Sequence, residues 1–585
     1  MSWGVALRNA VGLGLGGIPS LLNAPPYASL KLNFTEVNAL DSRITFSRNS
    51  NATLFGSNGS LQYAPHNLLT YSEQLDNAAW TKTNSTISAN SVVAPDGTVT
   101  ADSLLETTAN AGHRLQGVAT VSSGVPLAIS VYVKANGRTR FDLFEAFSST
   151  GFSFDLTNQT TSAPQTVGVA SATSASISDA GNGWYRCTVV LTSTTTSASL
   201  SILISNGSTT AYAGDGTSGI YVWGAQLNVG ALQPYYQTVA SAYYGPRFDY
   251  DPATLAARGL LIEEQRTNLC LYSEDLNQAA WAKGVGVTTT YNTVVAPDGN
   301  TTADTLTLSG TDNGVYESIT VTASTAYTWS WWVRLGTLAA ADFKFAIYNN
   351  TAAAFIVSDV VPTQTPNSTG WTRVSYSFTT PVGCTSIRVY VFRNFSVTAG
   401  TVNVWGMQLE AGAFATSYIP TTTTALTRAA DVASMTGANF SDWYNQTEGT
   451  LLTTTLAFNQ TLAPNRYVST MDDGTTNNII GAYIATDLNS SSFVVNGGVA
   501  VYQEIITTVS NTSANKISVT YKANNFTSAC NGVIGPVDTS GNVPVVNKIT
   551  FGNRTDGARP LNGWVRSFAY YPKQLSDGQL QALTK

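Results

Sequence analysis

Charged side chains are scarce in this sequence of 585 residues. Its 29 Lys and Arg and 35 Asp and Glu make up 11% of the chain, whereas a typical soluble protein has about 25%. Ser, Thr, Asn and Gly take the places that Lys and Glu hold on a helical protein's surface, which is typical of a β protein. The net charge is −6 and no Lys- or Arg-rich segment occurs, so we expect no nucleic acid partner.

Histidine and cysteine are also rare. The two histidines, His66 and His113, lie in different contexts, with no cysteine or acidic residue at the spacing of metal ligands. This argues against a histidine-based zinc site and against a Ser-His-Asp triad. The cysteines form no CxxC pair, so we expect buried free thiols in a protein assembled in a reducing cytosol. They are Cys187, Cys270, Cys384 and Cys530.

Long hydrophobic runs are missing as well. No segment approaches the roughly 18 consecutive apolar residues of a membrane helix. Residues 8–22 loosely imitate a signal peptide, but their glycines weaken its apolar region. We therefore expect neither a signal peptide nor membrane insertion. Hydrophobic residues still make up 43% of the chain and aromatic residues 10%, which excludes a disordered chain and allows about four domains.

An internal repeat organises the chain. The segment NLLTYSEQLDNAAW at 67–80 recurs as NLCLYSEDLNQAAW at 268–281. Two copies of one domain are therefore predicted, at 67–238 and 268–422, and the shorter second copy is expected to have lost loop residues. Further matches follow in the same order: VAPDG at 93–97 and 295–299, and WGAQL and WGMQL at 223–227 and 405–409.

Hydrophobic and polar residues alternate inside each copy, which indicates β-strands. Short strands of this kind, separated by Gly, Asn and Pro-Asp-Gly turns, predict antiparallel β-sandwiches of jelly-roll type. We also expect Trp223 and Trp405 in the core. The expected core faces of two strands are Ile129, Val131, Val133, Tyr185, Cys187, Val189 and Leu191 in the first copy, and Trp329, Trp331, Val333, Val374, Tyr376 and Phe378 in the second.

Three further regions complete the predicted domain plan. Residues 1–66 precede the first copy and contain a hairpin-like stretch, 42–62, with a turn at Asn58-Gly59. Residues 239–267 form a connector dense in charge, which predicts a hairpin held by ion pairs and a stiff joint. Residues 423–585 contain alternating strands and end in a capping-box pattern at Ser576. We predict a third sandwich there, closed by one small helix.

Aromatic residues on the non-core faces are candidates for glycan binding, and we expect their rings to be exposed. A flat ring can stack on the apolar face of a sugar while nearby Arg or Asn groups bond its hydroxyls. The alternative is that these rings pack under loops or in subunit contacts. The candidates are Tyr132 and Trp332, Trp184 with Arg186, and Trp371 with Arg373.

Two adjacent acidic residues, Asp472 and Asp473, are the candidates for a metal site. They lie in the turn-like segment MDDGTTNN. The interpretations open at this point are a structural Ca²⁺, a sugar contact, a catalytic carboxylate and a solvated turn. No other cofactor is expected.

The chain carries several distinctive motifs: ITFSR at 44–48, RFDYDP at 247–252, GLLIEEQRTNL at 259–269, and the YSE…AAW and WG-x-QL segments of both copies. Together they resemble tailed-bacteriophage fibre and head-decoration proteins. The repeats resemble the carbohydrate-binding-module jelly rolls of those proteins. GWVRSFAYYPKQLS at 563–576 is similar to the closing strand and helix of concanavalin A-like (laminin G-like) domains. In relatives the Ser-Arg motif leads directly into the Arg-Phe-Asp motif, so the first jelly roll looks inserted.

The resemblance implies a non-enzymatic virion structural protein, a fibre or a decoration protein. Residues 1–66 would anchor it to other virion proteins, and the sandwiches would project from the virion surface and bind host-surface or environmental glycans. It also implies a homotrimer, with assembly in the cytoplasm of the bacterial host. Two alternatives stay open: a purely architectural virion protein, and a polysaccharide depolymerase.

Overall fold

The computed structural model describes residues 27–166, 168–310, 314–396, 398–457, 465–487, 489–510 and 513–585. Most of these residues lie in β-strands, and the strands form antiparallel sheets, which confirms the predicted all-β sandwich class. Residues 1–26 of the predicted anchoring segment lie outside the described residues. The described residues form two compact units: unit 1 comprises residues 27–33, Asp41–Ile44 and the described part of Ser434–Lys585, and unit 2 comprises Phe34–Leu40 and the described part of Thr45–Ala433.

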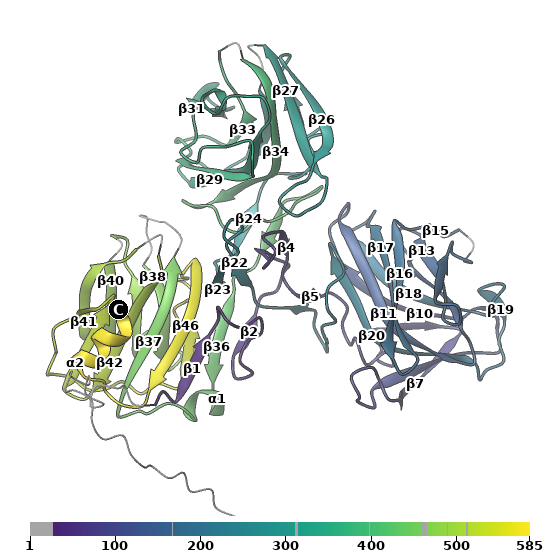
Figure 1. Cartoon of the computed structure of the whole chain (residues 1–585), viewed down its shortest axis with the longest axis horizontal. Coiled ribbons are helices and arrows are strands. Elements are labelled where there is room, and N and C mark those ends of the chain that lie inside the picture. Colours follow the sequence, from purple (N-terminus) through teal and green to yellow (C-terminus); the bar gives the residue numbers. More distant parts are fainter. Residues whose placement is uncertain are drawn as a thin grey trace, which may run out of the picture. The chain divides into compact units, whose positions relative to one another are not determined.

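The first repeat of unit 2 folds as a sandwich of two sheets (Figure 1). One sheet contains, in spatial order, β16 (Ser174–Gly181), β17 (Trp184–Thr192), β11 (Pro126–Asn136), β20 (Gly219–Val229), β8 (Ala101–Glu106) and β7 (Ser85–Val92). The other contains β14 (Thr160–Ser162), β13 (Thr150–Asp155), β12 (Arg140–Glu145), β18 (Ser197–Ser205), β10 (Arg114–Thr120) and β6 (Thr81–Thr83). Shorter additions are β15 (Ala170–Ser171), which pairs with β13, and the ladder of β9 (Asn110–Gly112) and β19 (Ala211–Ala213).

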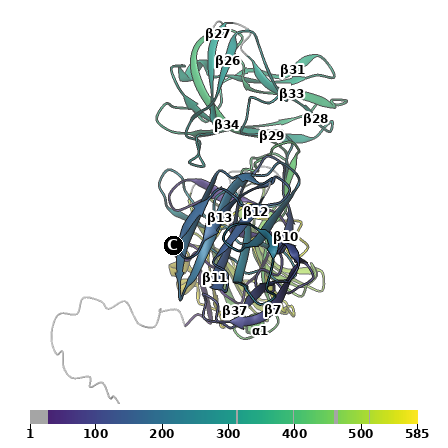
Figure 2. The same cartoon turned by 90° about the vertical axis from the view of Figure 1, so that its right-hand side faces the viewer.

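The second repeat has the same strand order in both sheets, without counterparts of the edge strands β14 and β16. Its strands β34, β29 and β33 are labelled in Figure 2. One sheet contains β32 (Thr372–Thr379), β29 (Ala326–Leu335), β34 (Thr398–Ala411), β27 (Ala303–Gly310) and β26 (Val287–Val294). The other contains β31 (Ala354–Val360), β30 (Phe345–Asn349), β33 (Ser386–Phe392), β28 (Val315–Thr320) and β25 (Trp281–Lys283). The 3-10 helix η2 (Ala340–Asp342) lies between β29 and β30.

The length difference between the repeats is not confined to loops, contrary to our expectation. In the first repeat β14, β15 and β16 lie between β13 and β17, whereas in the second repeat β32 follows β31 directly. Edge strands were therefore added or lost, because an edge strand can be removed without breaking the ladder of central strands.

The alternation of residues predicted the core faces well. Ile129, Val131 and Val133 are fully buried, as are their counterparts Trp329, Trp331 and Val333. Trp223 and Trp405 are buried too, although on the outer face of their sheet. All four cysteines are buried free thiols, as predicted. Tyr185 and Tyr376 depart from the pattern, because their rings are only half-buried.

In each sandwich the segment that enters and the segment that leaves pair with each other as a short two-stranded antiparallel ladder. Strand β5 (His66–Asn67) pairs with β21 (Tyr243–Tyr244), and β24 (Arg266–Asn268) pairs with β35 (Leu426–Arg428). The buried amide of Asn67 donates to the carbonyls of residues 225 and 236 and accepts from the N–H groups of 69 and 227. Asn268 makes the same four bonds, with residues 407, 419, 270 and 409. The first residue of each repeat therefore fastens the entering strand to the leaving segment.

The connector contains the predicted hairpin, formed by β22 (Phe248–Tyr250) and β23 (Ala257–Ile262). It also contributes to a cluster of five fully buried charged side chains, which we call the ion-pair hub: Arg48, Arg247, Arg428, Glu263 and Asp431. Arg247 Nη1 lies 2.6 Å from Glu263 Oε2, and Arg48 Nη1 lies 2.9 Å from Asp431 Oδ1. The ion pairs predicted for this region are therefore present, and they also join segments before and after both repeats.

A second hairpin precedes the first repeat, with arms β3 (Thr53–Phe55) and β4 (Leu61–Tyr63). Its turn contains Gly59 at φ 77°, as the Asn-Gly signal predicted. The arm before the turn is Thr53–Phe55, and the segment 42–50 is not part of it. Two further short strands are β2 (Thr45–Ser47) and β36 (Val432–Thr436).

Unit 1 contains the third pair of sheets. One sheet runs through β46 (Gly563–Tyr571), β37 (Glu448–Ala457), β42 (Asn515–Lys522), β43 (Asn525–Cys530) and β44 (Val533–Ile534), with β1 (Leu30–Asn33) beside β46. The other runs through β45 (Lys548–Phe551), β38 (Arg466–Asp472), β39 (Ile479–Ile484), β40 (Asn489–Asn496) and β41 (Val499–Thr508).

Helices are few and short. Helix α1 spans Ala438–Ser441, and α2 spans Asp577–Thr584 with the predicted capping box at Ser576. Within the described ranges, no helix has the length and apolar character needed to span a membrane.

Candidate functional site

The sequence candidates Tyr132, Trp184 and Arg186 belong to an aromatic cluster on the outer face of the first sandwich. The Tyr132 ring packs edge-on against Trp223, at 5.3 Å between ring centroids, and against Tyr235. The Arg186 guanidinium lies 5.5 Å from the Tyr132 ring centre and donates to the Ser130 hydroxyl and the carbonyl of residue 233. The Trp184 side chain is buried, and its indole N–H donates to the carbonyl of residue 93.

The second sandwich repeats this arrangement with Trp332, Trp405 and Tyr418. The Arg373 guanidinium lies 4.7 Å from the Trp332 ring centre and donates to the Ser330 hydroxyl and the carbonyl of residue 416. The half-buried Trp371 donates its indole N–H to the carbonyl of residue 295. Hairpin β3–β4 adds a cover here, since Leu61 and Phe55 pack on the cluster.

Our expectation that these rings are exposed was therefore wrong. Trp184 and Trp332 are almost fully buried, and Tyr132 is half-buried. The segment that leaves each sandwich after its last strand folds back over this face, and alternation along a strand does not reveal such a cover. The rings pack under loops, as the alternative interpretation proposed. In each repeat they therefore form a second, smaller core.

Asp472 and Asp473 hold turns in unit 1. The buried Asp472 carboxylate accepts from the N–H of Gly474 and lies 3.8 Å from Lys548 Nζ. Asp473 accepts from the Thr475 hydroxyl at 2.6 Å and from the Asn478 amide. Among the described residues no group of three or more His, Cys, Asp or Glu could hold a metal ion. The partly exposed Asp473 fits the solvated-turn alternative, whereas the Asp472 side chain is fully buried and does not.

A surface that the sequence analysis missed lies on the second sandwich. We call it the aromatic platform; it consists of Tyr316, Tyr348, Phe355, Arg388, Tyr390, Arg393 and Phe395. These side chains come from strands β28, β30, β31 and β33 and from the loop after β33. The inward residues of the same strands, such as Ile319, Ile347 and Val389, are buried in the core. Strand alternation therefore points the platform residues away from the core.

The platform residues form a closed series of contacts. Ring centroids are 4.8 Å apart for Tyr316 and Tyr390, 4.9 Å for Tyr348 and Phe355, and 5.2 Å for Phe355 and Phe395. Arg388 lies 4.8 Å from the Tyr316 ring centre and 5.3 Å from that of Tyr348. Arg393 lies 4.8 Å from the ring centre of Phe395 and 5.7 Å from that of Tyr390. The exposed fractions of Phe355 and Phe395 are 40% and 41%.

The first sandwich has no equivalent of this platform among its described residues. Residues 315–320 pair with β33 in the second sandwich, and residues 115–120 pair with β18 in the same register in the first. The two sheets can therefore be aligned residue by residue. Tyr316 and Arg388 then correspond to Gln116 and Ser199. The aromatic clusters are shared by both repeats, as the fold requires, whereas the platform is confined to one. Comparison of the outward positions of the two repeats would have revealed it from the sequence.

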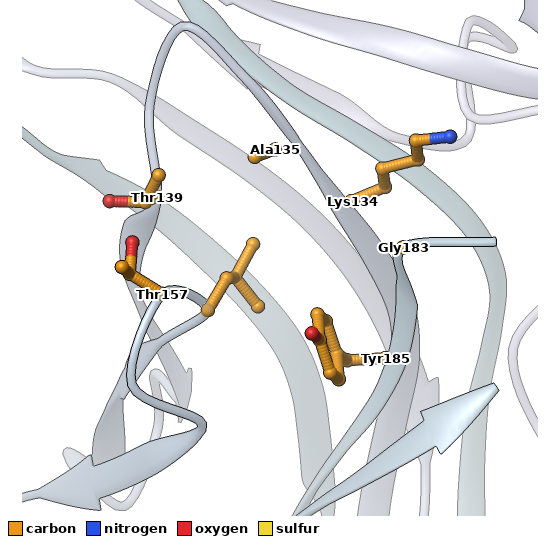
Figure 3. A pocket seen from close by; sticks show the side chains of 7 residues that line it. Lys134, Ala135, Thr139, Thr157, Gly183 and Tyr185 are labelled. Atoms are coloured by element: carbon orange, nitrogen blue, oxygen red, sulfur yellow. The ribbon is translucent and has the colours of Figure 1, made fainter. Parts of the chain in front are cut away.

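A shallow hollow of about 270 Å³ lies at one end of the first sandwich. Figure 3 shows Thr139 and Thr157 on one side of it, and Lys134 and Tyr185 on the other. The Tyr185 hydroxyl accepts from the Gln159 amide at 3.2 Å. The equivalent of Tyr185 in the second repeat is Thr372. With one ring, the hollow offers less aromatic surface than the platform.

Comparisons with known proteins give only distant likenesses. No protein-family model matches the chain, and no curated protein matches it either. The chain is similar to the CBM40 of Ruminococcus gnavus IT-sialidase bound to α2,3-sialyllactose, with 16% identity, coverage of 25% of this chain and 88% of that one, and a TM-score of 0.23. It is similar to the CBM22-1–CBM22-2 tandem of Paenibacillus barcinonensis Xyn10C, with 13% identity, coverage of 60% and 98%, and a TM-score of 0.23.

A third likeness is to the native heptameric SAP-like pentraxin of Limulus polyphemus, with 11% identity, coverage of 24% of this chain and 70% of that one, and a TM-score of 0.19. TM-scores this low carry no conclusion about the ligand of this chain. The all-β assignment rests on its own strand pairing.

Proposed function

We propose that the chain is a non-enzymatic structural protein of a bacteriophage virion that binds glycans through the aromatic platform. The observation that carries the glycan-binding part is the confinement of the platform to one repeat. Residues that both repeats share serve the common fold, so a group of outward-facing rings found in one alone, with Phe355 and Phe395 exposed and Tyr316 and Tyr348 half-buried, needs another reason. Aromatic rings beside guanidinium groups suit a sugar, because a ring covers its apolar face and the cation bonds its oxygens.

The virion role is supported by the resemblance of the sequence motifs to those of phage fibre and decoration proteins. Sandwiches coated with Ser, Thr and Asn and joined by a buried ion-pair hub suit a stiff, outward-facing protein. In a homotrimer, three platforms would bind a repeating polysaccharide with greater avidity than one. Imaging of a phage particle carrying a tagged chain, together with the mass of the purified protein, tests the location and the trimer.

The glycan-binding proposal is tested with a double variant of the platform, Tyr348→Ala with Phe355→Ala. A glycan array identifies a ligand of the full chain, and calorimetry compares the variants. We expect affinity to fall at least tenfold, because two stacking surfaces are removed. The matched control is Phe147→Ala, which removes a ring of similar exposure, 46%, from the first sandwich and leaves binding unchanged.

Two outcomes count against the proposal. Unchanged binding by the double variant would move the site away from the platform. New reducing ends after incubation of the chain with the bound polysaccharide would contradict its non-enzymatic character.

A further inference from the structure

Arg388 occupies an unusual position at the centre of the platform. Its guanidinium lies between the rings of Tyr316 and Tyr348, at 4.8 and 5.3 Å from their centres. Its Nε atom is buried and has no hydrogen-bond partner. Within the part of the chain that the structure describes, no ion pair or hydrogen bond joins the Arg388 side chain to another residue.

Other arginines that lie over rings in this protein do have partners. Arg186 and Arg373 each donate to a serine hydroxyl and to a backbone carbonyl. The arginines of the ion-pair hub face carboxylates. Stacking on a ring therefore does not by itself leave a guanidinium without partners, and Arg388 is the exception among these.

The repeats also differ in charge at this position. In the first sandwich the equivalent residue is Ser199, whose N–H and hydroxyl donate to the buried carboxylate of Glu145 at 2.9 and 3.2 Å. The second sandwich replaces this serine with a cation. The first repeat therefore has a neutral hydroxyl, bonded to a buried carboxylate, at the position where the second repeat places a cation.

We propose that the platform selects acidic polysaccharides, with Arg388 as the residue that recognises the sugar carboxylate. This inference rests on the proposed glycan-binding function and names its ligand class. A guanidinium offers five N–H donors in a planar fork that fits a carboxylate bidentately. Because two tyrosine rings shield Arg388 from water, an anion that reaches its edge is bound more strongly than at a fully solvated cation.

The test uses pairs of polymers that differ only in charge. The acidic panel contains polygalacturonate, alginate, hyaluronate and polysialic acid, and each is paired with its methyl-esterified form. We expect the full chain to bind at least one acidic polymer tenfold or more tightly than its ester. Affinity for that polymer should fall as salt rises from about 50 to about 500 mM, because ions screen the attraction.

Two substitutions at position 388 separate the contribution of the positive charge from that of the planar guanidinium donors. Arg388→Met keeps the length of the side chain and should bind the acid and the ester equally. Arg388→Lys keeps the charge without the fork and should retain part of the preference. Equal thermal midpoints of the variants show that the fold is intact.

The outcomes separate this inference from the proposed function. Equal binding of every acid and its ester by the wild type, or an unchanged preference in Arg388→Met, overturns the acidic selectivity while platform binding stands. Failure of all glycans, acidic and neutral, to bind overturns the proposed function and the selectivity with it. Retention of a virion protein by the platform in place of any glycan would overturn both as well.

Discussion

Two buried glutamates of unit 2 experience opposite electrostatic environments. Burial alone would raise the pKa of Glu263, but Arg428 and Arg247, with hydrogen bonds from Ser417, lower it to about 2. Among the described residues no such cation acts on Glu317, so its burial raises the pKa to about 8, although the N–H of Leu271 bonds its carboxylate and opposes the shift. Glu317 lies on the inner face of β28, behind the aromatic platform.

These shifts predict opposite dependences of stability on pH. A carboxyl whose pKa is raised by folding stabilises the protein below its unfolded pKa, near 4.5, and this contribution is lost as the pH rises through 8. We expect Glu317→Gln to match the wild type near pH 4 and to exceed it in free energy of unfolding at pH 9. Urea unfolding at both pH values measures the difference.

The companion variant Glu263→Gln reverses the direction. The lowered pKa means that the Glu263 carboxylate stabilises the fold above pH 4.5 and that this contribution is lost as the pH falls through about 2. The variant should lose about 3 kcal/mol at pH 7, because Arg247 and Arg428 keep their buried charge without that partner. A pH-independent difference for either variant would contradict the assignment.

At the scale of elements, hairpin β3–β4 distinguishes the two repeats. It covers the aromatic cluster of the second sandwich, where Leu61 packs on Trp332, Trp405 and Tyr418. The Thr53 hydroxyl also donates to the carbonyl of Tyr418 at 2.5 Å. In the first sandwich Tyr132 and Tyr235 stay half-buried. The hairpin therefore acts as part of the second sandwich although it precedes the first in sequence.

Replacement of Leu61 by serine should uncover that cluster. We expect a loss of about 3 kcal/mol, since a buried leucine is removed and a polar group is placed against rings. Hydrogen exchange should become faster at residues 294–303 and 405–418 and stay unchanged at 92–101 and 223–235. The exposed Leu232, changed to serine, is the control. Equal acceleration in both repeats would show general loosening in place of a local cover.

The sequence predicted correctly those features that depend only on the residues of one strand, turn or helix end. Ile129, Val131 and Val133 were assigned to the core by alternation alone, and the Asn58-Gly59 turn and the Ser576 capping box were predicted from local chemistry. It failed for Trp332, because the cover over that ring comes from residues 53–61 and 416–418. It missed the platform, whose rings become neighbours only when β28, β30, β31 and β33 pair.

At the scale of the whole molecule, comparison of the two repeats distinguishes residues that build the common fold from residues that are available for binding. Asn67 and Asn268, and the arginines Arg186 and Arg373, make the same bonds in both repeats. Their recurrence is explained by the common architecture. The platform uses the outward positions of a sheet that is already complete, so its composition is free to change without cost to the core.

This distinction predicts what happens when residues at equivalent positions of the two repeats are exchanged. The double variant Tyr316→Gln with Arg388→Ser gives the second sandwich the residues of the first at two platform positions. Each change lies at an outward position away from caps and core, so the free energy of unfolding should shift by less than about 1 kcal/mol. Affinity for the bound glycan should nevertheless fall at least tenfold.

The reciprocal change serves as its control. Val118 of the first sandwich is 51% exposed and corresponds to Ser318, so Val118→Ser makes an exchange of the same kind outside the platform and should leave both stability and binding unchanged. Large destabilisation by the platform exchange would mean that its rings are needed for folding, as those of the shared clusters are. Full binding with a native fold would place the glycan elsewhere on the chain, and the Tyr185 hollow would then be the next surface to test.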